Sequence, residues 1–485
     1  MRLWSPASRA RGTYCSPLRG DIPSKPRPSA GRVEGLVCFL LGWLSLEALY
    51  LRIAQLGDLR RHAGEFLVYA GVAFLVYLGL VAVVRQLTRS ASRQPRWMLW
   101  GLLIGAVGFR VTLVGLTPTL SDDIHRYLWD GRVQLAGLNP YRYAPDDEAL
   151  TSLRDASWAL INHKDIPTIY PPLMQLAFRV GAWLSPTIPA QKWLFLTFDL
   201  ALLLLLIACL PRWGIPPVMS VIYAWHPLVV IEVAASGHND PLGVVCLMTG
   251  LWLWQARRRW LGTVSFALAF LAKFTTVLLW PFYWVRARKE GLVFLVALAA
   301  AGLWSRCSPH VTPGLGHYVR HWEFNGSLYP LLVALLGDPL LVRALSACVV
   351  MGAGWWMARR SEGRQGRAEC RNRWGSGRSD DLVGYTMWMI QAMILLTPVL
   401  EPWYLLWLIP LFCVRFSWMW LVFSGSTLLS YTVLIRYVSA GIWQIPLWAK
   451  LVEYVPLYAW LLWHAWKRLS QTSDISKNRW LATCA

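Results

Sequence analysis

The chain has 485 residues, of which 56% are hydrophobic, and its mean hydropathy is +0.40. This composition excludes a soluble enzyme, because many apolar runs approach the ~20 residues that cross a bilayer as a helix. The runs are continuous rather than alternating, which favours helices over a transmembrane β-barrel. We therefore expect an all-α polytopic membrane protein with about 11–13 transmembrane helices.

The chain carries 47 Lys and Arg residues against 26 Asp and Glu residues, a net charge of +21. The basic residues gather in short segments between apolar runs, so the positive-inside rule explains them better than binding to nucleic acid. The 31 Trp residues fit aromatic belts at the two membrane interfaces. The nine Cys residues include no CxxC pair, which argues against a zinc site or a disulfide scaffold.

Residues 1–33 are basic and rich in Pro and Ser, as expected of a disordered cytoplasmic tail or of a start codon placed too early. The tail and the basic segment 85–96 both belong on the cytoplasmic side, so the loop 117–170 falls outside. A membrane domain over 34–466 is expected to follow the tail. The expected spans are 34–54, 66–84, 97–116, 190–210, 216–234, 240–256, 290–305, 339–358, 383–399, 403–414, 417–435 and 447–466.

Two basic segments near the end of the chain agree with this orientation. Segment 359–381 is rich in Arg and Gly and is expected to be a flexible cytoplasmic loop. Residues 467–485 would form a cytoplasmic tail.

Two apolar segments do not fit a plain crossing. Segment 171–184 is short and carries Arg179, so we expect it to lie at the outer interface or to dip in without crossing. Segment 260–285 has basic residues at both ends and Lys273 at its middle. Either two half-helices broken near Lys273 return the chain to the same side, or one plain span crosses the membrane and one basic cluster departs from the positive-inside rule.

Two adjacent carboxylates, Asp122 and Asp123, follow the third apolar run. Charge near a bilayer is costly, so this cluster is a functional-site hypothesis. Desolvation would raise the basicity of a carboxylate here and suit it to take a proton from a hydroxyl, whereas the alternative is a helix N-cap. Arg126 and Asp130 follow Asp123 at i+3 and i+7, so the three share one helix face.

Further polar motifs are expected on the outer side, each with two interpretations. The aromatic residues of the NPYRY motif at 139–143 could stack on a sugar or anchor the loop, and the YPP motif at 170–172 could mark only a helix start. The GHND motif at 237–240 offers a second carboxylate or caps a helix. The stretch 317–325 could contact an acceptor or a lipid phosphate, or form an amphipathic interfacial helix. The candidate substrate-binding residues are Arg126, Tyr127, Asp130, Tyr141, Tyr170, His238, Asn239, Asp240, Lys273, Arg320, Trp322 and Asn325.

Other polar residues admit structural roles as readily as chemical ones. Arg110 and Asp199 lie inside apolar runs, where a charge needs a partner or a polar cavity. Glu401 ends a span beside a Pro residue and is expected to form a cavity wall. The His residues around 317–321 lack metal-binding spacing, so no metal site is predicted there.

The segment SDDIHRYLWDGRVQLAGLNPYRYAPDDEAL resembles the first outer loop of the GT-C superfamily of integral membrane glycosyltransferases. The similarity is strongest to bacterial polyprenol-phosphate-mannose-dependent mannosyltransferases of the family 87-like type. It covers residues 97–435, although three spans precede the outer loop where many relatives have one. The supporting motifs, in the order typical of such proteins, are YPPL at 170–173, GHND at 237–240, LAKF at 271–274, WEFNGSLY at 322–329 and EPWYLLW at 401–407.

The resemblance implies a GT-C fold in the inner (plasma) membrane and a polyprenyl-phosphate sugar donor that is used on the extracytoplasmic face. Mannose is the expected sugar, transferred with inversion, and Asp122 or Asp123 would be the base that activates the acceptor hydroxyl. Preorganised cations should stabilise the leaving phosphate. The cationic candidates are Arg126, His238, Lys273 and Arg320.

The sequence leaves several partners open. GT-C enzymes differ in their use of a divalent cation, so no cofactor is assigned. The acceptor is a glycan, a lipid or a protein, the linkage is undetermined, and membrane lipids surround the chain.

Two other functions are compatible with these features. A transporter or flippase of lipid-linked sugars would also need intramembrane charge, but it would typically show repeated halves, and we find no internal repeat. A non-catalytic component of an envelope glycan assembly complex is the other alternative. Both predict that replacing the acidic pair leaves sugar transfer intact.

Overall fold

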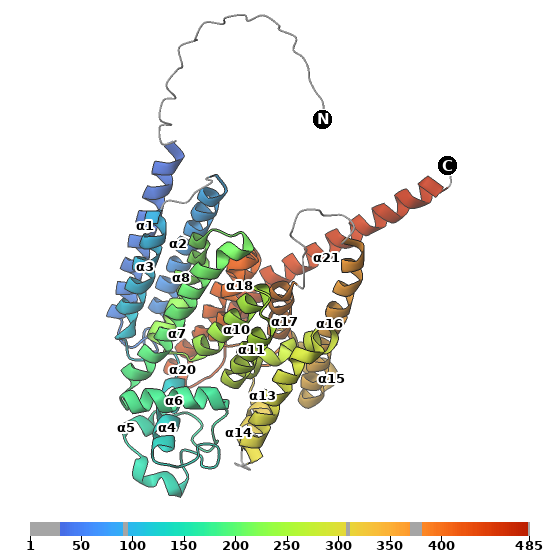
Figure 1. Ribbon diagram of the computed structural model, residues 1–485. Helices are drawn as coiled ribbons and strands as arrows, with labels where there is room; N and C mark the ends of the chain where they lie inside the picture. Colours follow the sequence, from blue (N-terminus) through green and yellow to red (C-terminus); the bar gives the residue numbers. More distant parts are fainter. Residues whose placement is uncertain (1–29, 91–95, 307–310, 369–380, 484–485) are drawn as a thin grey trace, which may run out of the picture.

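The computed structural model describes residues 30–90, 96–306, 311–368 and 381–483 (Figure 1). Within these ranges the chain is helical, and its only β pairing is a pair of isolated bridges that join Phe324 and Asn325 to Val399. The prediction of an all-α polytopic membrane protein is confirmed. Residues 1–29, most of the expected N-terminal tail, lie outside the described residues.

The first part of the chain forms long upright helices and a compact outer cap (Figure 1). The upright helices are α1 (Ala30–Gln55), α2 (Ala63–Ser90), α3 (Arg96–Val114) and α7 (Ile188–Cys209). The cap contains α4 (Asp123–Leu135), η1 (Glu148–Leu153), α5 (Ala156–Ala159) and α6 (Pro172–Leu184).

The middle of the chain consists of shorter helices that complete the bundle. They are η2 (Leu210–Trp213), η3 (Pro217–Ser220), α8 (Val221–Ala224), α9 (Pro227–Val230), η4 (Ile231–Ala235), α10 (Asp240–Gln255), α11 (Arg259–Ala272), η5 (Phe274–Leu279), α12 (Trp280–Arg286) and α13 (Arg288–Arg306).

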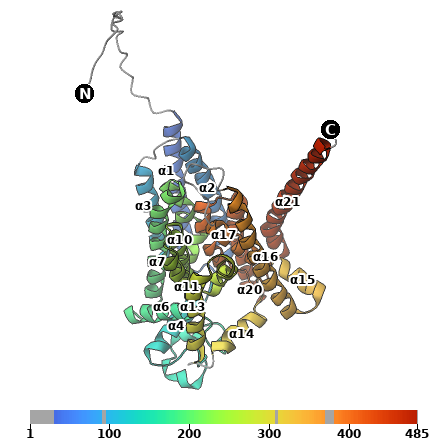
Figure 2. The ribbon, with the colours of Figure 1, turned by 45° about the vertical axis from the view of Figure 1, so that its right-hand side comes forward.

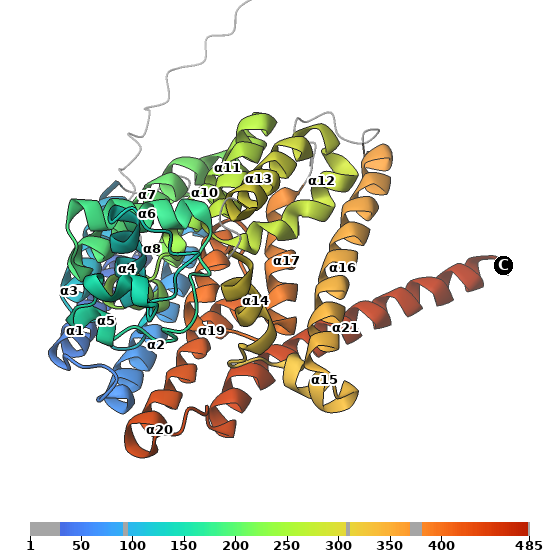
Figure 3. The ribbon, with the colours of Figure 1, turned by 90° about the horizontal axis from the view of Figure 1, so that it is seen from below.

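The last part adds α14 beside the cap, a group of helices on the far side of the bundle, and a further group that returns to pack against α2 and α8 (Figures 2 and 3). These are α14 (Val311–His321), α15 (Leu328–Leu336), α16 (Pro339–Ala368), α17 (Leu382–Leu396), η6 (Pro402–Trp407), α18 (Ile409–Val414), α19 (Trp418–Ser426), η7 (Thr427–Tyr431), α20 (Thr432–Ala440) and α21 (Leu447–Thr483).

Six helices in the described part of the chain are long and apolar enough to cross a membrane, or seven if one bent pair counts as a span. The bent pair joins 217–224 to 227–235 with an angle of 62°. Pro227 explains the bend, because proline removes a backbone donor and disfavours helical geometry in the residue before it. Of the other expected spans, 240–256, 383–399 and 403–414 are present as shorter or interrupted helices, and 290–305 and 447–466 lie on the long helices α13 and α21, which are not among the six.

The expected break at Lys273 is confirmed. α11 ends at Ala272, Lys273 has extended backbone angles (φ −157°, ψ 132°), and η5 starts at the next residue. Irregular backbone at membrane depth is tolerated where it is buried in protein or lines a cavity. The break at Lys273 is therefore a candidate position for a functional site.

α6 lies across the lower end of α7 rather than alongside it (Figure 1). Leu176, Trp183 and Leu184 keep an apolar surface exposed, and the buried Gly131 brings α4 into contact with the other side of α6. A Cβ atom at Gly131 would lie 2.3 Å from the carbonyl oxygen of Phe178, so only glycine permits this approach. The arrangement agrees with the interfacial placement expected for 171–184.

Two expected loops are partly helical. α16 continues to Ala368, so the first half of the predicted loop 359–381 is helix, while 369–380 lie outside the described residues. α21 continues to Thr483 through the predicted tail. Propensity explains the difference, because Ala, Arg, Lys, Gln and Glu favour helix even where hydropathy ends.

The end of α2 and the start of α3, which flank the basic connection, lie at the opposite end of the bundle from α4–α6 (Figure 1). The upper end of α16, which carries Arg359 and Arg360, lies on the same side as that connection. This polarity agrees with the expected orientation of the loop 117–170. The membrane side that each end faces stays a prediction.

Candidate active site

Asp122 is held by an ion pair. The guanidinium of Arg60, in the connection between α1 and α2, donates to Asp122 Oδ1 at 2.6 Å and to the carbonyl of Thr119 at 2.9 Å. Asp122 occupies the N-cap position of α4, but its side chain makes no capping hydrogen bond. The carboxylate therefore docks one loop onto another rather than capping the helix.

Asp123 is the first residue of α4 and is partly accessible. No ion pair to it occurs among the described residues. The pKa of its carboxyl is raised to about 6, chiefly by burial and also by Asp122 and Asp240, against the lowering effect of Lys273 and of a hydrogen bond from Asn162. An accessible carboxylate with a pKa near neutrality is suited to accept a proton.

Lys273 faces the same site from the break after α11. Its Nζ donates to Asp240 Oδ1 at 2.5 Å and lies 4.7 Å from the ring centroid of Tyr404. The indole Nε1 of Trp407 donates to the same Asp240 oxygen at 2.6 Å. Asp240 is buried, whereas Lys273 keeps about a quarter of its side chain exposed, 26%. The ammonium is thus fixed in position and still reachable by an anionic ligand.

Glu401 and two tyrosines close the cluster. Glu401 is partly accessible and precedes η6, and burial, Asp123 and Glu232 raise the pKa of its carboxyl well above the ordinary value, against the effect of Lys273. The hydroxyl groups of Tyr404 and Tyr318 are 2.6 Å apart, which connects η6 to α14. A protonated Glu401 would leave Lys273 facing fewer negative charges.

The GHND turn packs directly against the start of α4. Gly237 has φ +74°, and a Cβ atom there would lie 2.5 Å from Ile124 Cδ1. His238 stacks on Trp403 with 3.8 Å between ring centroids and lies 3.4 Å from Glu232. Burial and Lys273 lower the pKa of His238 well below its ordinary value, so the imidazole is neutral and is not one of the expected cations.

Asn239 starts α10 without a capping side-chain bond, so the alternative N-cap role is not observed. Its Nδ2, together with Asp240 Oδ2 and His238 Nδ1, is buried without a hydrogen-bond partner among the described residues. Buried polar atoms normally have partners. These three atoms are therefore unusual among the buried polar groups of the described residues.

Arg126 and Asp130 lie in a different, structural network. Arg126 Nε donates to Asp130 Oδ1 at 2.8 Å, and its NH2 group donates to the carbonyl of Ile166 at 2.9 Å. Gln175 in α6 donates to the other Asp130 oxygen at 2.8 Å and to Thr168 at 2.7 Å. The expected cation Arg126 is thus committed to holding the outer loop and α6 on α4.

The three tyrosines that were expected to bind substrate, Tyr127, Tyr141 and Tyr170, are linked to one another beside α4. Tyr127 stacks on Phe178 with 4.7 Å between ring centroids and meets Tyr170 edge-on at 5.2 Å. The hydroxyl of Tyr141 donates to the carbonyl of Tyr170 at 2.6 Å. Tyr170 is partly accessible, and burial and the negative charge of Asp123 raise the pKa of its hydroxyl. Tyr127 and Tyr141 are buried.

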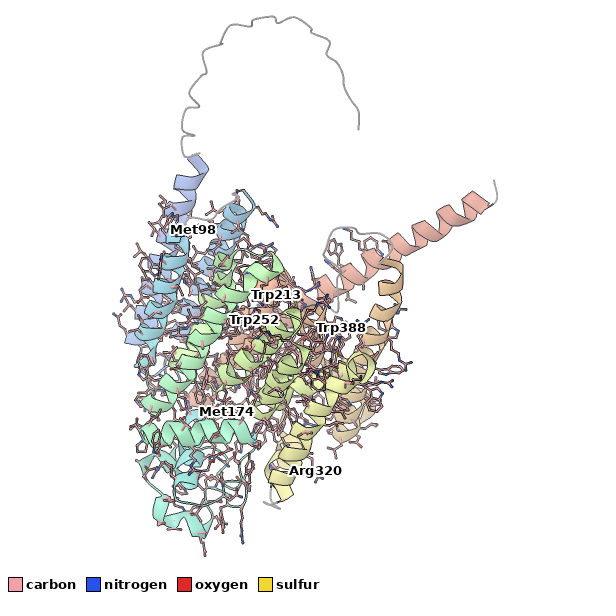
Figure 4. The ribbon with its side chains drawn as sticks, in the orientation of Figure 1. Met98, Met174, Trp213, Trp252, Arg320 and Trp388 are labelled. Atoms are coloured by element: carbon pink, nitrogen blue, oxygen red, sulfur yellow. The ribbon has the colours of Figure 1, made fainter. Side chains whose placement is uncertain are left out.

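The stretch 317–325 begins on α14, as the interfacial-helix alternative predicted. Arg320 is exposed near the cap end of the molecule, away from Trp213 and Trp252 (Figure 4). Trp322 contacts His163 in the outer loop, with 4.2 Å between ring centroids. Asn325 Nδ2 donates to both oxygens of Glu453 at 3.0 Å, so its side chain ties α21 to this stretch.

The charges inside the apolar runs pair with each other. Arg110 Nε donates to Asp199 Oδ2 at 2.5 Å, and Tyr223 donates to Asp199 Oδ1 at 2.5 Å. The side chains of Arg110 and Asp199 are inaccessible, so this group is structural. In the described residues no group of three His, Cys, Asp or Glu side chains is arranged to hold a metal ion.

Sequence analysis missed Arg60 and Trp407 and assigned Glu401 only a wall role. Arg60 gave no signal, because a basic residue between two spans is common. The Glu-Pro-Trp-Tyr motif at a span end was the available signal for η6. The cluster as a whole combines a partly accessible carboxylate with a raised pKa, a lysine fixed by a carboxylate, and unpartnered hydrogen-bonding atoms.

Comparison with known proteins shows the family of the chain. A family model described as "Alpha-(1->6)-mannopyranosyltransferase, N-terminal domain", for the MptA/B family, matches residues 35–289, more than half of the chain. The matched segment contains Asp123, the GHND turn and Lys273. Searches of curated proteins and of solved structures returned no match.

Proposed function

The chain belongs to the MptA/B family of alpha-(1->6)-mannopyranosyltransferases, and on this premise we propose that it moves mannose from a polyprenyl-phosphate donor to an acceptor hydroxyl on the extracytoplasmic face. The family establishes mannosyl transfer by a multi-pass membrane protein. The donor, the face and the catalytic residues are the proposal. The observation that carries it is the pairing of a partly accessible Asp123 with the fixed ammonium of Lys273 in one cluster.

Asp123 acts as the general base in this mechanism. Its carboxylate takes the proton of the acceptor hydroxyl while the hydroxyl oxygen attacks the anomeric carbon of mannose. The bond from that carbon to the phosphate oxygen breaks, and the lipid phosphate leaves with the electron pair. A single displacement of this kind inverts the anomeric carbon.

Lys273 stabilises the negative charge on the leaving phosphate. Its Nζ is already held by Asp240, whose Oδ1 also accepts from the indole of Trp407, so little reorganisation is needed when the charge develops. The unpartnered atoms of His238 and Asn239 would bind hydroxyl groups of the mannose. The family name supports a 6-hydroxyl of mannose as the acceptor group, giving an α(1→6) linkage.

The outer location rests on charge distribution. The basic ends of α2 and α3 lie opposite the cap that carries Asp123 (Figure 1), and the positive-inside rule assigns such ends to the cytoplasm. Intact spheroplasts should therefore mannosylate an acceptor oligosaccharide that cannot cross the membrane. Labelling only after the cells are opened would contradict this orientation.

The test of the mechanism uses purified protein in lipid nanodiscs with radiolabelled polyprenyl-phosphate mannose and an α-mannoside acceptor. Asp123→Asn should lower transfer by roughly 10²–10⁴-fold, the usual contribution of a general base. Asp122→Asn is the matched control and should keep most of the activity. Unchanged transfer by Asp123→Asn would refute the base assignment, and digestion of the product with a linkage-specific mannosidase would test the α(1→6) bond.

A further inference from the structure

A separate cavity of about 310 Å³ lies between the 323–325 stretch and the connection from α20 to α21. A cavity of this size falls in the range that binds small ligands. Nothing in the proposed mechanism uses it. It is lined by Glu323, Phe324, Asn325, Trp443, Gln444, Ile445, Leu447 and Lys450.

The lining combines aromatic rings with hydrogen-bonding groups. The rings of Phe324 and Trp443 are 6.0 Å apart between centroids, and 56% of Trp443 is exposed. Such a ring offers an apolar surface to the C–H face of a sugar, while Gln444 offers an amide to its hydroxyl groups. Aromatic and polar groups at one cavity are suited to a neutral polyhydroxyl ligand.

The charge of the cavity argues against a phosphate. Lys450 is the cation of the lining and Glu323 is its carboxylate, so the two charges balance. Arg343 lies 3.1 Å from Glu323, but its side chain is 9% exposed, and its guanidinium also donates to the carbonyl of Trp322. A phosphate would need an excess of available donors with positive charge.

Asn325 presents an unsatisfied acceptor. Its side-chain Nδ2 donates to Glu453, and its backbone carbonyl accepts from the Tyr454 hydroxyl at 2.6 Å. The residue is 3% exposed. Its Oδ1 is buried and has no hydrogen-bond partner among the described residues. Because both Nδ2 bonds fix the amide, Oδ1 is held in place for a ligand hydroxyl.

The cavity wall is connected to the active site through the backbone. The amide of Phe324 donates to the carbonyl of Pro398 at 3.0 Å, and the amide of Leu400 donates to the carbonyl of Phe324 at 2.8 Å. Val399, which forms the β-bridge, is two residues before Glu401, a separation of at most about 7 Å along the chain. The stretch that lines the cavity is therefore bonded to the segment that leads into Glu401.

We propose that this cavity is a subsite for a sugar residue of the acceptor glycan, beyond the residue that reacts. The proposal rests on the proposed function, which supplies a glycan as acceptor. The subsite selects an oligosaccharide over a monosaccharide acceptor. Trp443 stacks on the sugar ring, and Asn325 and Gln444 bind its hydroxyl groups.

The first test compares acceptors of increasing length, from a methyl mannoside to an α(1→6)-linked tetramannoside. For the tetramannoside, Trp443→Ala should raise the KM about tenfold, the effect of losing one aromatic contact, with kcat and the KM for the donor unchanged. The monosaccharide should show no change. Trp448→Ala is the matched control, because Trp448 is 54% exposed near the start of α21 and does not line the cavity.

A binding experiment separates this proposal from the catalytic one. Saturation-transfer NMR with the tetramannoside and no donor should detect the acceptor on the Asp123→Asn protein and lose the signal of its non-reacting residues when Trp443→Ala is added. Equal signals with and without Trp443 would overturn the subsite whatever Asp123→Asn does to transfer. An altered KM for the lipid donor alone would overturn it too, by assigning the cavity to the donor lipid.

Discussion

Arg60 binds Asp122 at 2.6 Å and leaves its neighbour Asp123 without an ion pair among the described residues. The two carboxylates are adjacent in sequence, but they face different surroundings. One is neutralised by a guanidinium from the α1–α2 connection, and the other faces the cluster of Lys273, Asp240 and Glu401. The acidic pair thus divides into a docking residue and a candidate base.

The pH dependence of transfer should follow Asp123. A general base works when deprotonated, and the pKa of Asp123 is about 6, so kcat/KM should rise through pH 6 and level off above it. Below pH 5 the rate should fall about tenfold per pH unit if one group controls it. Rates measured between pH 4.5 and 8, with protein stability checked at each pH, test this. A profile that is flat down to pH 5 would exclude Asp123 as the controlling group.

Substitutions of Asp122 and of its partner Arg60 should shift that pH profile in opposite directions. Asp122 raises the pKa of Asp123, so Asp122→Asn should shift the acidic limb to lower pH. Arg60→Ala leaves Asp122 uncompensated and should shift the limb to higher pH. Each shift should be roughly half a unit to one unit, because both side chains are partly exposed and screened. Shifts of the same sign would contradict this electrostatic account.

Lys273→Gln should lower kcat by roughly 10²–10³-fold, since a preorganised charge on the leaving group is lost. The KM for the acceptor should change little. Lys273→Arg should recover part of the rate by keeping the charge, although its planar group does not match the geometry of an ammonium. The comparison is Trp407→Phe, which removes the other donor to Asp240 Oδ1 but keeps the cation. If Trp407→Phe matched the kcat loss of Lys273→Gln, Lys273 would have only a structural role.

Gly131→Ala should destabilise the cap. The new methyl group would lie 2.3 Å from Phe178 O and 2.8 Å from Ala182, forcing α4 and α6 apart. Overpacking of this kind costs about 1–3 kcal/mol. Thermal unfolding in detergent should show a lower midpoint for this variant, while Gly79→Ala in α2 should not, because nothing lies within 4 Å of a Cβ atom there. Equal midpoints would mean that α6 can shift freely.

Hydropathy and charge were sufficient to predict most of the helices. The expected spans 34–54 and 97–116 agree with α1 and α3 to within a few residues. For segment 260–285 the sequence left a break near Lys273 and a plain span open, and the structure has the break. α15 was missed, because a nine-residue apolar helix is too short to register as a span.

The site was harder to predict than the fold, because its geometry is made by contacts between distant segments. The motifs identified Asp123, Asp240 and Lys273 as candidates, but they could not distinguish Asp123 from Asp122. That distinction depends on Arg60, 62 residues away from Asp122. The sequence predicted that Arg126 and Asp130 bind the substrate. The structure shows that Arg126 donates to Ile166 and that Asp130 accepts from Gln175 instead. No periodicity in the sequence carries such information.

The family segment ends at residue 289, yet Glu401, Tyr404 and Trp407 reach the same cluster from η6. The matched segment therefore contains the proposed base and the proposed cation without the residues of 401–407 that surround them. Premature termination after α13 would produce a polypeptide that contains the whole matched segment but an Asp240 that lacks its indole donor.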